Sequence, residues 1–297
     1  MAVLNPDLVL CFDEYASQGH ALAEALGVPC RSVALHRFPD GESLVRLPES
    51  LPPRVVFCRS LHQPNDKLVE LMLAARTARE LGAERVDLVA PYLCYMRQDK
   101  AFHPGEAVSQ RIVGAWLAEL FDGLVTVDPH LHRVHSLKEA VPLQHAVALH
   151  ATGPIGEWIG RQFDDPLLVG PDAESEQWVA AIARPQGLDY IVGQKQRLGD
   201  REVRIALPPA RIGGRPVVLV DDVASTGRTL EVAARSLAAH GPSEMAAVVT
   251  HALFVGDALQ RLHAAGVRRV VSTDAIPHPT NAIPLAGLLA EGLQHAP

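Results

Sequence analysis

Short apolar runs rich in β-branched residues alternate along the chain with longer segments in which apolar positions recur every three or four residues. The first pattern is typical of buried strands and the second of helices packed on one face. Their regular alternation predicts parallel βα units. The predicted strands are 7–12, 55–60, 86–92, 123–127, 167–170, 188–192, 216–221, 246–252 and 268–272. The predicted helices are 66–82, 107–121, 174–184, 229–240, 257–265 and 284–294.

The 297 residues are enough for two hydrophobic cores, so two domains are expected. The two halves share the same alternating layout without a residue-level repeat. We predict two similar α/β domains, each a twisted, mostly parallel sheet flanked by helices, over 1–147 and 148–297. The last predicted helix, 284–294, is expected to pack back onto the first domain.

Composition narrows the class of function. Hydrophobic residues make up 48% of the chain and charged residues 21%, which is typical of a globular protein. The net charge of −7, with no basic tract, argues against nucleic-acid binding. The first residues lack a signal-peptide pattern, and no apolar stretch reaches the length of a membrane span, so we expect a cytoplasmic protein.

The cysteines and histidines show no metal-binding spacing. Cys11, Cys30, Cys58 and Cys94 are scattered without a CxxC pattern, which predicts reduced, buried thiols. The 14 histidines form neither an HExxH motif nor a Cys/His cluster along the chain, so the sequence does not predict a zinc site.

The segment 215–237 carries the most informative motif. A buried strand ends in Asp221 and Asp222, and a turn of small residues then opens a helix. Such a turn lets consecutive backbone N–H groups converge on an anion at a helix N-terminus. A phosphate monoester fits there, with the two carboxylates placed to accept hydrogen bonds from sugar hydroxyls. The phosphate-binding residues expected in this turn are Ser225, Thr226, Gly227, Arg228 and Thr229.

An ordinary capped turn between a strand and a helix would use similar residues, so the motif by itself leaves that alternative open. It is not a Walker A loop, because the lysine and glycine spacing of that loop is missing. The pattern resembles the phosphoribosyl pyrophosphate signature of the type I phosphoribosyltransferase fold. That resemblance implies a ribose 5-phosphate site at 221–229.

Further segments resemble the ribose-phosphate pyrophosphokinase family, and especially its archaeal-type branch. They are RFPDGE at 37–42, PYLCYMRQDKAFHPGE at 91–106, VDPHLHR at 127–133, VGPDAESEQW at 169–178 and KQRLGDREV at 195–203. Because they occur in order over nearly the whole chain, the resemblance implies transfer of a diphosphate from Mg-ATP to ribose 5-phosphate. ATP, ribose 5-phosphate and Mg²⁺ are therefore the expected partners.

The resemblance also implies residue roles in ATP binding. Phe38, Asp40 and Glu42 are expected to hold the adenine and ribose of ATP and to reach a neighbouring subunit, which implies a homo-oligomer. Arg97 and Gln98 are expected to contact adenine and phosphates. An aromatic face offers stacking, and carboxylates accept from amine and hydroxyl donors.

His130 and Asp172 each follow a predicted strand, at the sheet edge where open α/β folds bind ligands. By resemblance His130 is a metal-linked, ATP-binding residue and Asp172 its partner for Mg²⁺ and ribose. Magnesium prefers a few protein oxygens together with substrate phosphates, which suits this pair. The neighbouring His132 and His135 are expected to be surface residues.

Lys195 and Arg197 correspond to the family's catalytic Lys-x-Arg pair on a loop that closes over the triphosphate. Cationic groups there would meet the charge that develops in diphosphoryl transfer. The chain departs from the family at Ser225, where the bacterial branch has an aspartate, and at Arg228, where most members have a glycine. Arg228 could add charge for the phosphate or narrow the pocket.

Three other functions remain open at the level of sequence. A phosphoribosyltransferase would keep 215–237 but would not need the ATP segments. A non-catalytic regulatory homologue would keep the fold as a partner-binding subunit. A kinase acting on a related phosphosugar would use the same sites.

Overall fold

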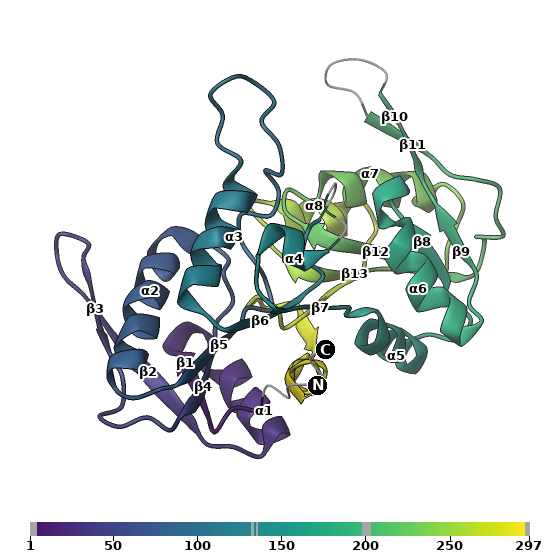
Figure 1. Ribbon diagram of the computed structural model, residues 1–297. Helices are drawn as coiled ribbons and strands as arrows, with labels where there is room; N and C mark the ends of the chain where they lie inside the picture. The colour runs from purple at the N-terminus through teal and green to yellow at the C-terminus, as the bar shows by residue number, and fades with distance from the viewer. Residues whose placement is uncertain (1–4, 132–133, 135, 198–202, 295–297) are drawn as a thin grey trace. The chain divides into compact units, whose positions relative to one another are not determined.

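The computed structural model describes residues 5–131, 134, 136–197 and 203–294. The chain forms two compact units: unit 1 comprises residues 1–150 and 286–297, and unit 2 comprises residues 151–285. Each unit is a sheet covered by helices on both faces (Figure 1). Among the described residues, none of the helices combines the length and hydropathy that a membrane span requires.

The sheet of unit 1 has the strand order β3-β2-β1-β4-β5-β6-β7. The β2–β3 pair is an antiparallel hairpin, and the other neighbouring strands pair in parallel. The strands are β1 (Leu8–Phe12), β2 (Cys30–Arg37), β3 (Ser43–Arg46), β4 (Arg54–Cys58), β5 (Arg85–Val89), β6 (Gly123–Val127) and β7 (His145–Leu149). The helices are η1 (Asp13–Tyr15), α1 (Ala16–Leu26), α2 (Pro64–Glu80), α3 (Ser109–Leu120), α4 (Leu137–Ala140) and α9 (Ala286–Gln294).

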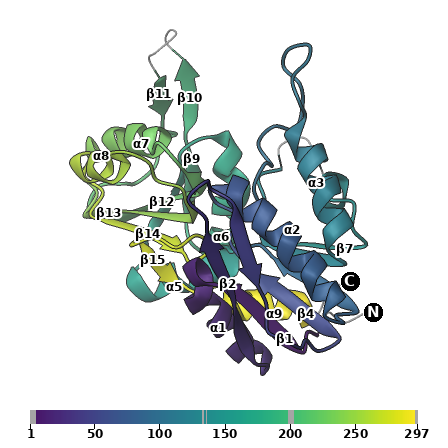
Figure 2. The same cartoon turned by 90° about the vertical axis from the view of Figure 1, so that its left-hand side faces the viewer.

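Two groups of helices cover the two faces of this sheet (Figure 2). Leu10, Phe57 and Leu88 point from the strands into a core shared with Leu71 of α2 and Leu117 of α3. On the other face α9 packs against α1 and the strands β6 and β7, although it follows unit 2 in the chain.

The sheet of unit 2 has the order β15-β14-β13-β12-β8-β9, with parallel neighbours, and a separate antiparallel hairpin joins β10 to β11. The strands are β8 (Leu167–Gly170), β9 (Tyr190–Val192), β10 (Gln194–Arg197), β11 (Val203–Ala206), β12 (Pro216–Ala224), β13 (Glu244–Ala252), β14 (Arg269–Thr273) and β15 (Asn281–Ile283). The helices are α5 (Thr152–Gln162), η2 (Ala173–Ser175), α6 (Glu176–Gln186), α7 (Arg228–Ala238) and α8 (Ala258–Ala264). Helices α7 and α8 share a core with one face of the sheet, and α6 packs on β8 and β12.

The two units share one topology. The run β2-β1-β4-β5-β6-β7 of unit 1 corresponds in order and direction to β9-β8-β12-β13-β14-β15 of unit 2. In each unit the second strand lies on one side of the first strand, and the third strand lies on the other side. The strand order therefore reverses between β1 and β4 in unit 1 and between β8 and β12 in unit 2. Ligands of open α/β sheets bind beside the carboxyl ends of the strands at such a switch point.

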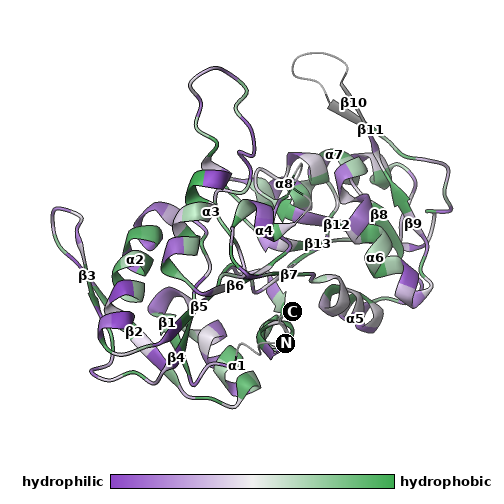
Figure 3. Ribbon diagram, viewed as in Figure 1, coloured by the Kyte–Doolittle hydropathy of each residue, from purple (hydrophilic) through white to green (hydrophobic). Residues whose placement is uncertain are grey.

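The predicted fold class is confirmed, and each predicted strand and helix overlaps one that the structure contains. The structure adds elements that the pattern did not predict, namely β2, β3, β7, β10, β11, β15, α1, α4 and α5. Most of the added strands lie at sheet edges or in hairpins, where polar residues interrupt the apolar run. Figure 3 shows the mixed hydropathy of the covering helices, whose apolar faces turn toward the sheets.

Candidate functional site

The predicted phosphate loop connects β12 to α7 in unit 2. Asp221 and Asp222 lie near the carboxyl end of β12, and Gly227 is the residue directly before α7. Gly227 has a φ of 67°, a left-handed conformation that side chains with a Cβ disfavour, and an added Cβ would lie 3.4 Å from Ala258 Cβ. The glycine therefore lets the backbone turn tightly into the helix, so that the first N–H groups of α7 face the loop.

Three carboxylates gather at the switch point of unit 2. Burial and the nearby carboxylates of Asp222 and Asp172 raise the pKa of Asp221 well above its usual range. Asp172 follows β8 and accepts a hydrogen bond from the N–H of Glu174 at 3.1 Å, so it also caps η2. A cation held among these oxygens would offset their mutual repulsion, and oxygen donors are the ligands that Mg²⁺ prefers. The donor set therefore fits Mg²⁺.

The side chain of Arg228 pairs along α7. Its guanidinium contacts the buried Glu231 at 3.2 Å, one helical turn later, and Arg235 contacts the same carboxylate at 3.1 Å. Arg261, on α8, donates to the carbonyl oxygen of Thr226 at 2.6 Å. Arg228, which departs from the family pattern, thus forms an ion pair on its own helix. Arg261 connects the loop to α8 through its hydrogen bond.

Lys195 and Arg197 lie on β10, where their Cα positions pair with Ile205 and Val203 of β11. Their side chains are outside the described part of the structure. Both strands of this hairpin belong to unit 2.

The segment RFPDGE forms the turn of the β2–β3 hairpin in unit 1. The N–H of Phe38 donates to Glu42 O at 2.8 Å, and the N–H of Glu42 donates to Asp40 Oδ1 at 3.2 Å. Phe38 is 39% exposed and meets the ring of His36 edge-on at 5.0 Å. The turn thus presents an aromatic ring and two exposed acids to solvent.

Arg97 and Gln98 lie in the loop between β5 and α3, and the Arg97 side chain is exposed. The Gln98 amide contacts Lys100 O at 3.3 Å and Glu106 Oε2 at 3.4 Å. Glu106 also accepts from the N–H of Phe102 at 2.7 Å. These contacts fold the loop back on itself and leave Arg97 available to an anion.

His130 follows β6 and is half-buried. Two residues earlier, Asp128 has a φ of 39° and accepts a hydrogen bond from His150 at 2.9 Å. That bond raises the pKa of His150 above its usual value. Sequence reasoning missed this pair, although an acid directly after a buried strand was a usable signal. His132 and His135 lie outside the described residues.

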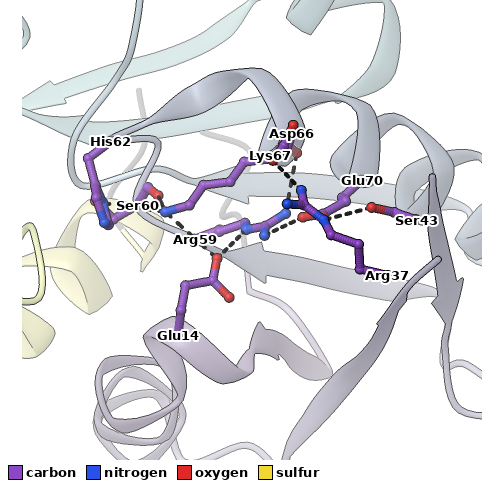
Figure 4. A network of polar contacts seen from close by, with 9 residues as sticks. All are labelled: Glu14, Arg37, Ser43, Arg59, Ser60, His62, Asp66, Lys67 and Glu70. Atoms are coloured by element: carbon purple, nitrogen blue, oxygen red, sulfur yellow. Dashed lines mark hydrogen bonds and ion pairs between the residues drawn. The ribbon is translucent and has the colours of Figure 1, made fainter. Parts of the chain in front are cut away.

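The switch point of unit 1 holds an internal ion-pair network (Figure 4), whereas three carboxylates gather at that of unit 2. Arg59 directly follows β4, and its side chain is only 3% exposed. It donates to Glu14, after β1, at 2.7 Å and to Glu70, on α2, at 2.5 Å, and it lies over the ring of Phe12. Lys67 donates to the carbonyl oxygen of Ser60 at 2.8 Å. Protein cations therefore fill the position that carboxylates occupy in unit 2.

The loop that enters α2 also differs from the phosphate loop. Gln63 takes the left-handed conformation before the helix, with a φ of 50°, as Gly227 does before α7. The next residue is Pro64, which has no N–H to offer to an anion. The loop that enters α2 therefore offers one backbone N–H fewer at the start of its helix than the loop of unit 2 does.

The fold and the loop of unit 2 define a type I phosphoribosyltransferase-like α/β protein. Residues 9–120 match a family model described as the N-terminal domain of ribose phosphate pyrophosphokinase, and residues 144–282 match the phosphoribosyl transferase domain. The chain belongs to the ribose-phosphate pyrophosphokinase family.

Individual relatives agree over almost the full length. The ribose-phosphate pyrophosphokinase of Methanopyrus kandleri is 37% identical over 97% of this chain and 99% of its own. That of Saccharolobus solfataricus is 34% identical over 86% of this chain and 88% of its own. The crystal structure of phosphoribosylpyrophosphate synthetase from Mycobacterium smegmatis has the same fold, with a TM-score of 0.81, 24% identity and 97% coverage of both chains.

Proposed function

We propose that the protein transfers the β,γ-diphosphate of Mg-ATP to the C1 hydroxyl of ribose 5-phosphate, giving phosphoribosyl pyrophosphate and AMP. The observation that carries this proposal is the loop 221–229, set at the switch point of unit 2 beside Asp172, in a chain that aligns throughout with ribose-phosphate pyrophosphokinases. We propose further that unit 1 is the ATP-binding domain and unit 2 the ribose 5-phosphate-binding domain.

In unit 2, the phosphate of ribose 5-phosphate would lie at the start of α7. The N–H groups and hydroxyls available there belong to Ser225, Thr226, Gly227, Arg228 and Thr229. The positive end of the helix dipole adds to these donors. Asp221 and Asp222, one step back on β12, would accept from the ribose hydroxyls.

In unit 1, Phe38, Asp40 and Glu42 would bind the adenine and ribose of ATP, and Arg97 and Gln98 would contact adenine and phosphates. The exposure of Phe38 supports a homo-oligomer in which this turn serves a neighbouring subunit. We also propose that the protein works in the cytoplasm, where its substrates are found.

Asp172 of unit 2 would bind Mg²⁺, and His130 of unit 1 would contribute to the binding of ATP and its metal. The bound ion would neutralise charge on the phosphates and align them. Asp172 is suited to this role because its carboxylate already lies within electrostatic reach of Asp221. The crowding of acids raises the pKa of Asp221, and this supports a cation between them.

The ribose C1 hydroxyl would attack the β-phosphorus of ATP in line with the departing AMP. Lys195 and Arg197 would meet the charge that develops on the transferred group and on the leaving group. No covalent enzyme intermediate is invoked, because the reacting hydroxyl belongs to the substrate. Closure of the hairpin over the triphosphate would keep water from the reaction.

The alternatives have less support. A phosphoribosyltransferase would need only unit 2, whereas residues 9–120 match the N-terminal domain of the pyrophosphokinases. A regulatory homologue would not need the site residues that the chain keeps, among them His130, Asp172, Lys195 and Asp221.

A mass-resolved assay of the purified protein with ribose 5-phosphate, Mg²⁺ and ATP tests the proposal. We expect AMP and phosphoribosyl pyrophosphate in equal amounts. Formation of ADP in place of AMP would indicate a simple phosphosugar kinase. Absence of turnover under conditions in which a known pyrophosphokinase is active would favour the regulatory homologue.

The phosphate loop can be tested at Gly227. Gly227→Ala forces a Cβ into the left-handed conformation, at a cost of about 1–2 kcal/mol, and shifts the loop that would hold the phosphate. We expect KM for ribose 5-phosphate to rise about 10-fold while KM for ATP changes little. Gly241 has a similar φ of 65° and open space around it, so Gly241→Ala is a control with matched backbone strain. Equal effects of the two variants on KM would contradict the role of the loop.

A further inference from the structure

Two cysteines of unit 1 meet on the face of the sheet that α1 covers. The register pairs Val9 with Cys30 and Cys11 with Ser32, so the side chains of Cys11 and Cys30 lie on the same face of β1 and β2. Their sulfur atoms are 3.4 Å apart. Cys11 is fully buried, and Cys30 is half-buried at the edge of the covered region.

A histidine from α1 completes the cluster. Gly19 brings α1 into close contact with β1, since a Cβ at that position would come 2.4 Å from Cys11 Cβ. The next residue, His20, offers a ring nitrogen that lies, with the two sulfur atoms, in a group whose members are all within 4.8 Å of one another. His20 is exposed, so the cluster opens to solvent on that side.

A disulfide does not suit this geometry. Cys11 and Cys30 are offset by two residues along neighbouring strands, which places their Cα atoms about 8 Å apart. Disulfides need Cα atoms closer than about 7 Å, so the strands would have to shift.

A zinc ion suits the arrangement of the two cysteines and His20 better than a disulfide does. With Zn–S bonds of about 2.3 Å and a tetrahedral angle, the two sulfurs of a zinc site lie about 3.8 Å apart. The two sulfur atoms are 3.4 Å apart, so they would need to separate only slightly to bind zinc. Two thiolates and an imidazole are soft or borderline ligands that Zn²⁺ accepts and Mg²⁺ avoids, so the cluster would not compete with the acidic site of unit 2.

We propose that Cys11, His20 and Cys30 form a binding site for Zn²⁺, with water at the fourth position. The bound ion would tie β1, β2 and α1 together. The two thiols would lose their protons on binding, and each thiolate would donate an electron pair to the metal. The site is independent of diphosphate transfer, and a failure of either proposal would leave the other standing.

Titration of the reduced, chelator-treated full-length protein with Co²⁺ tests the site. We expect one equivalent to bind, with a thiolate-to-cobalt absorption band and the visible bands of tetrahedral cobalt, and Zn²⁺ to displace it. Cys11→Ser and Cys30→Ser should each abolish the thiolate band or reduce it to a single-thiolate spectrum. His20→Gln should weaken binding about 10-fold or more, an effect of the size seen when groups around a metal are altered.

Cys94→Ala and His240→Gln are the matched controls, because neither residue belongs to the cluster, and both variants should bind Co²⁺ like the parent. Zn²⁺ should also raise the melting temperature of the parent and of both controls, but not that of Cys30→Ser. Because Cys30 is less buried than Cys11, Cys30→Ser keeps this test available if Cys11→Ser fails to fold. Absence of the thiolate band in the parent protein, or a band of undiminished intensity in Cys30→Ser, would overturn the proposal. A protein that binds no metal and instead forms a Cys11–Cys30 disulfide in air, detected by mass spectrometry, would also overturn the proposal.

Discussion

Lys195→Ala is expected to lower kcat for formation of AMP and phosphoribosyl pyrophosphate by about 10³-fold or more, with little change in KM for ribose 5-phosphate. A cation that meets charge in the transition state contributes on this scale, because its interaction is stronger there than in the ground state. Lys195 lies on the β10–β11 hairpin and is not among the residues 221–229 that we propose hold the phosphate, so binding of the sugar phosphate should persist. Initial rates of AMP release, measured over a range of both substrates, separate the two parameters.

Gln196→Ala is the control for this variant, because Gln196 is the next residue on the same strand and carries no charge. We expect its kcat to remain within a few-fold of the parent. If Lys195→Ala kept parental kcat, the hairpin would have no part in the chemistry. If it raised KM for ribose 5-phosphate alone, Lys195 would be a substrate-binding residue.

Arg59→Leu is expected to lower the free energy of unfolding by about 3–5 kcal/mol, because it leaves the buried carboxylate of Glu70 without its charged partner. Glu14, the second partner, is 35% exposed and can be hydrated, so the penalty arises mainly at Glu70. Denaturant-induced unfolding followed by circular dichroism measures the change. The catalytic site should be affected only through the folded fraction.

Two comparisons make this result specific. Arg54→Ala removes an ion pair with Asp7 in which both side chains are substantially exposed, and it should cost no more than about 1 kcal/mol. Arg59→Leu combined with Glu70→Leu removes both buried charges and should recover part of the loss. A loss for Arg59→Leu as small as that for Arg54→Ala would mean that the network contributes little to stability.

The sequence by itself determined the features that depend on neighbouring residues. The alternation of apolar runs with amphipathic segments predicted the α/β class, because burial on one or both faces imposes these periods. The turn from β12 into α7 was also predicted, since Asp221, Asp222 and the small residues before the helix are consecutive in the chain. The edge strands β3, β7 and β15 were missed because an edge strand is half solvated and gives a weaker pattern, whereas the edge strand β9 was predicted.

Only the tertiary structure decided which distant residues meet. Arg59 contacts both Glu14 and Glu70, which belong to other elements, because β1 and β4 are neighbours and α2 packs on the same sheet. In the same way Cys11, His20 and Cys30 have no metal-binding spacing, and the register of β1 with β2 brings them together. Parallel strands are joined through long crossovers, so residues that share a site are separated by whole helices, and spacing along the chain carries no record of their contact.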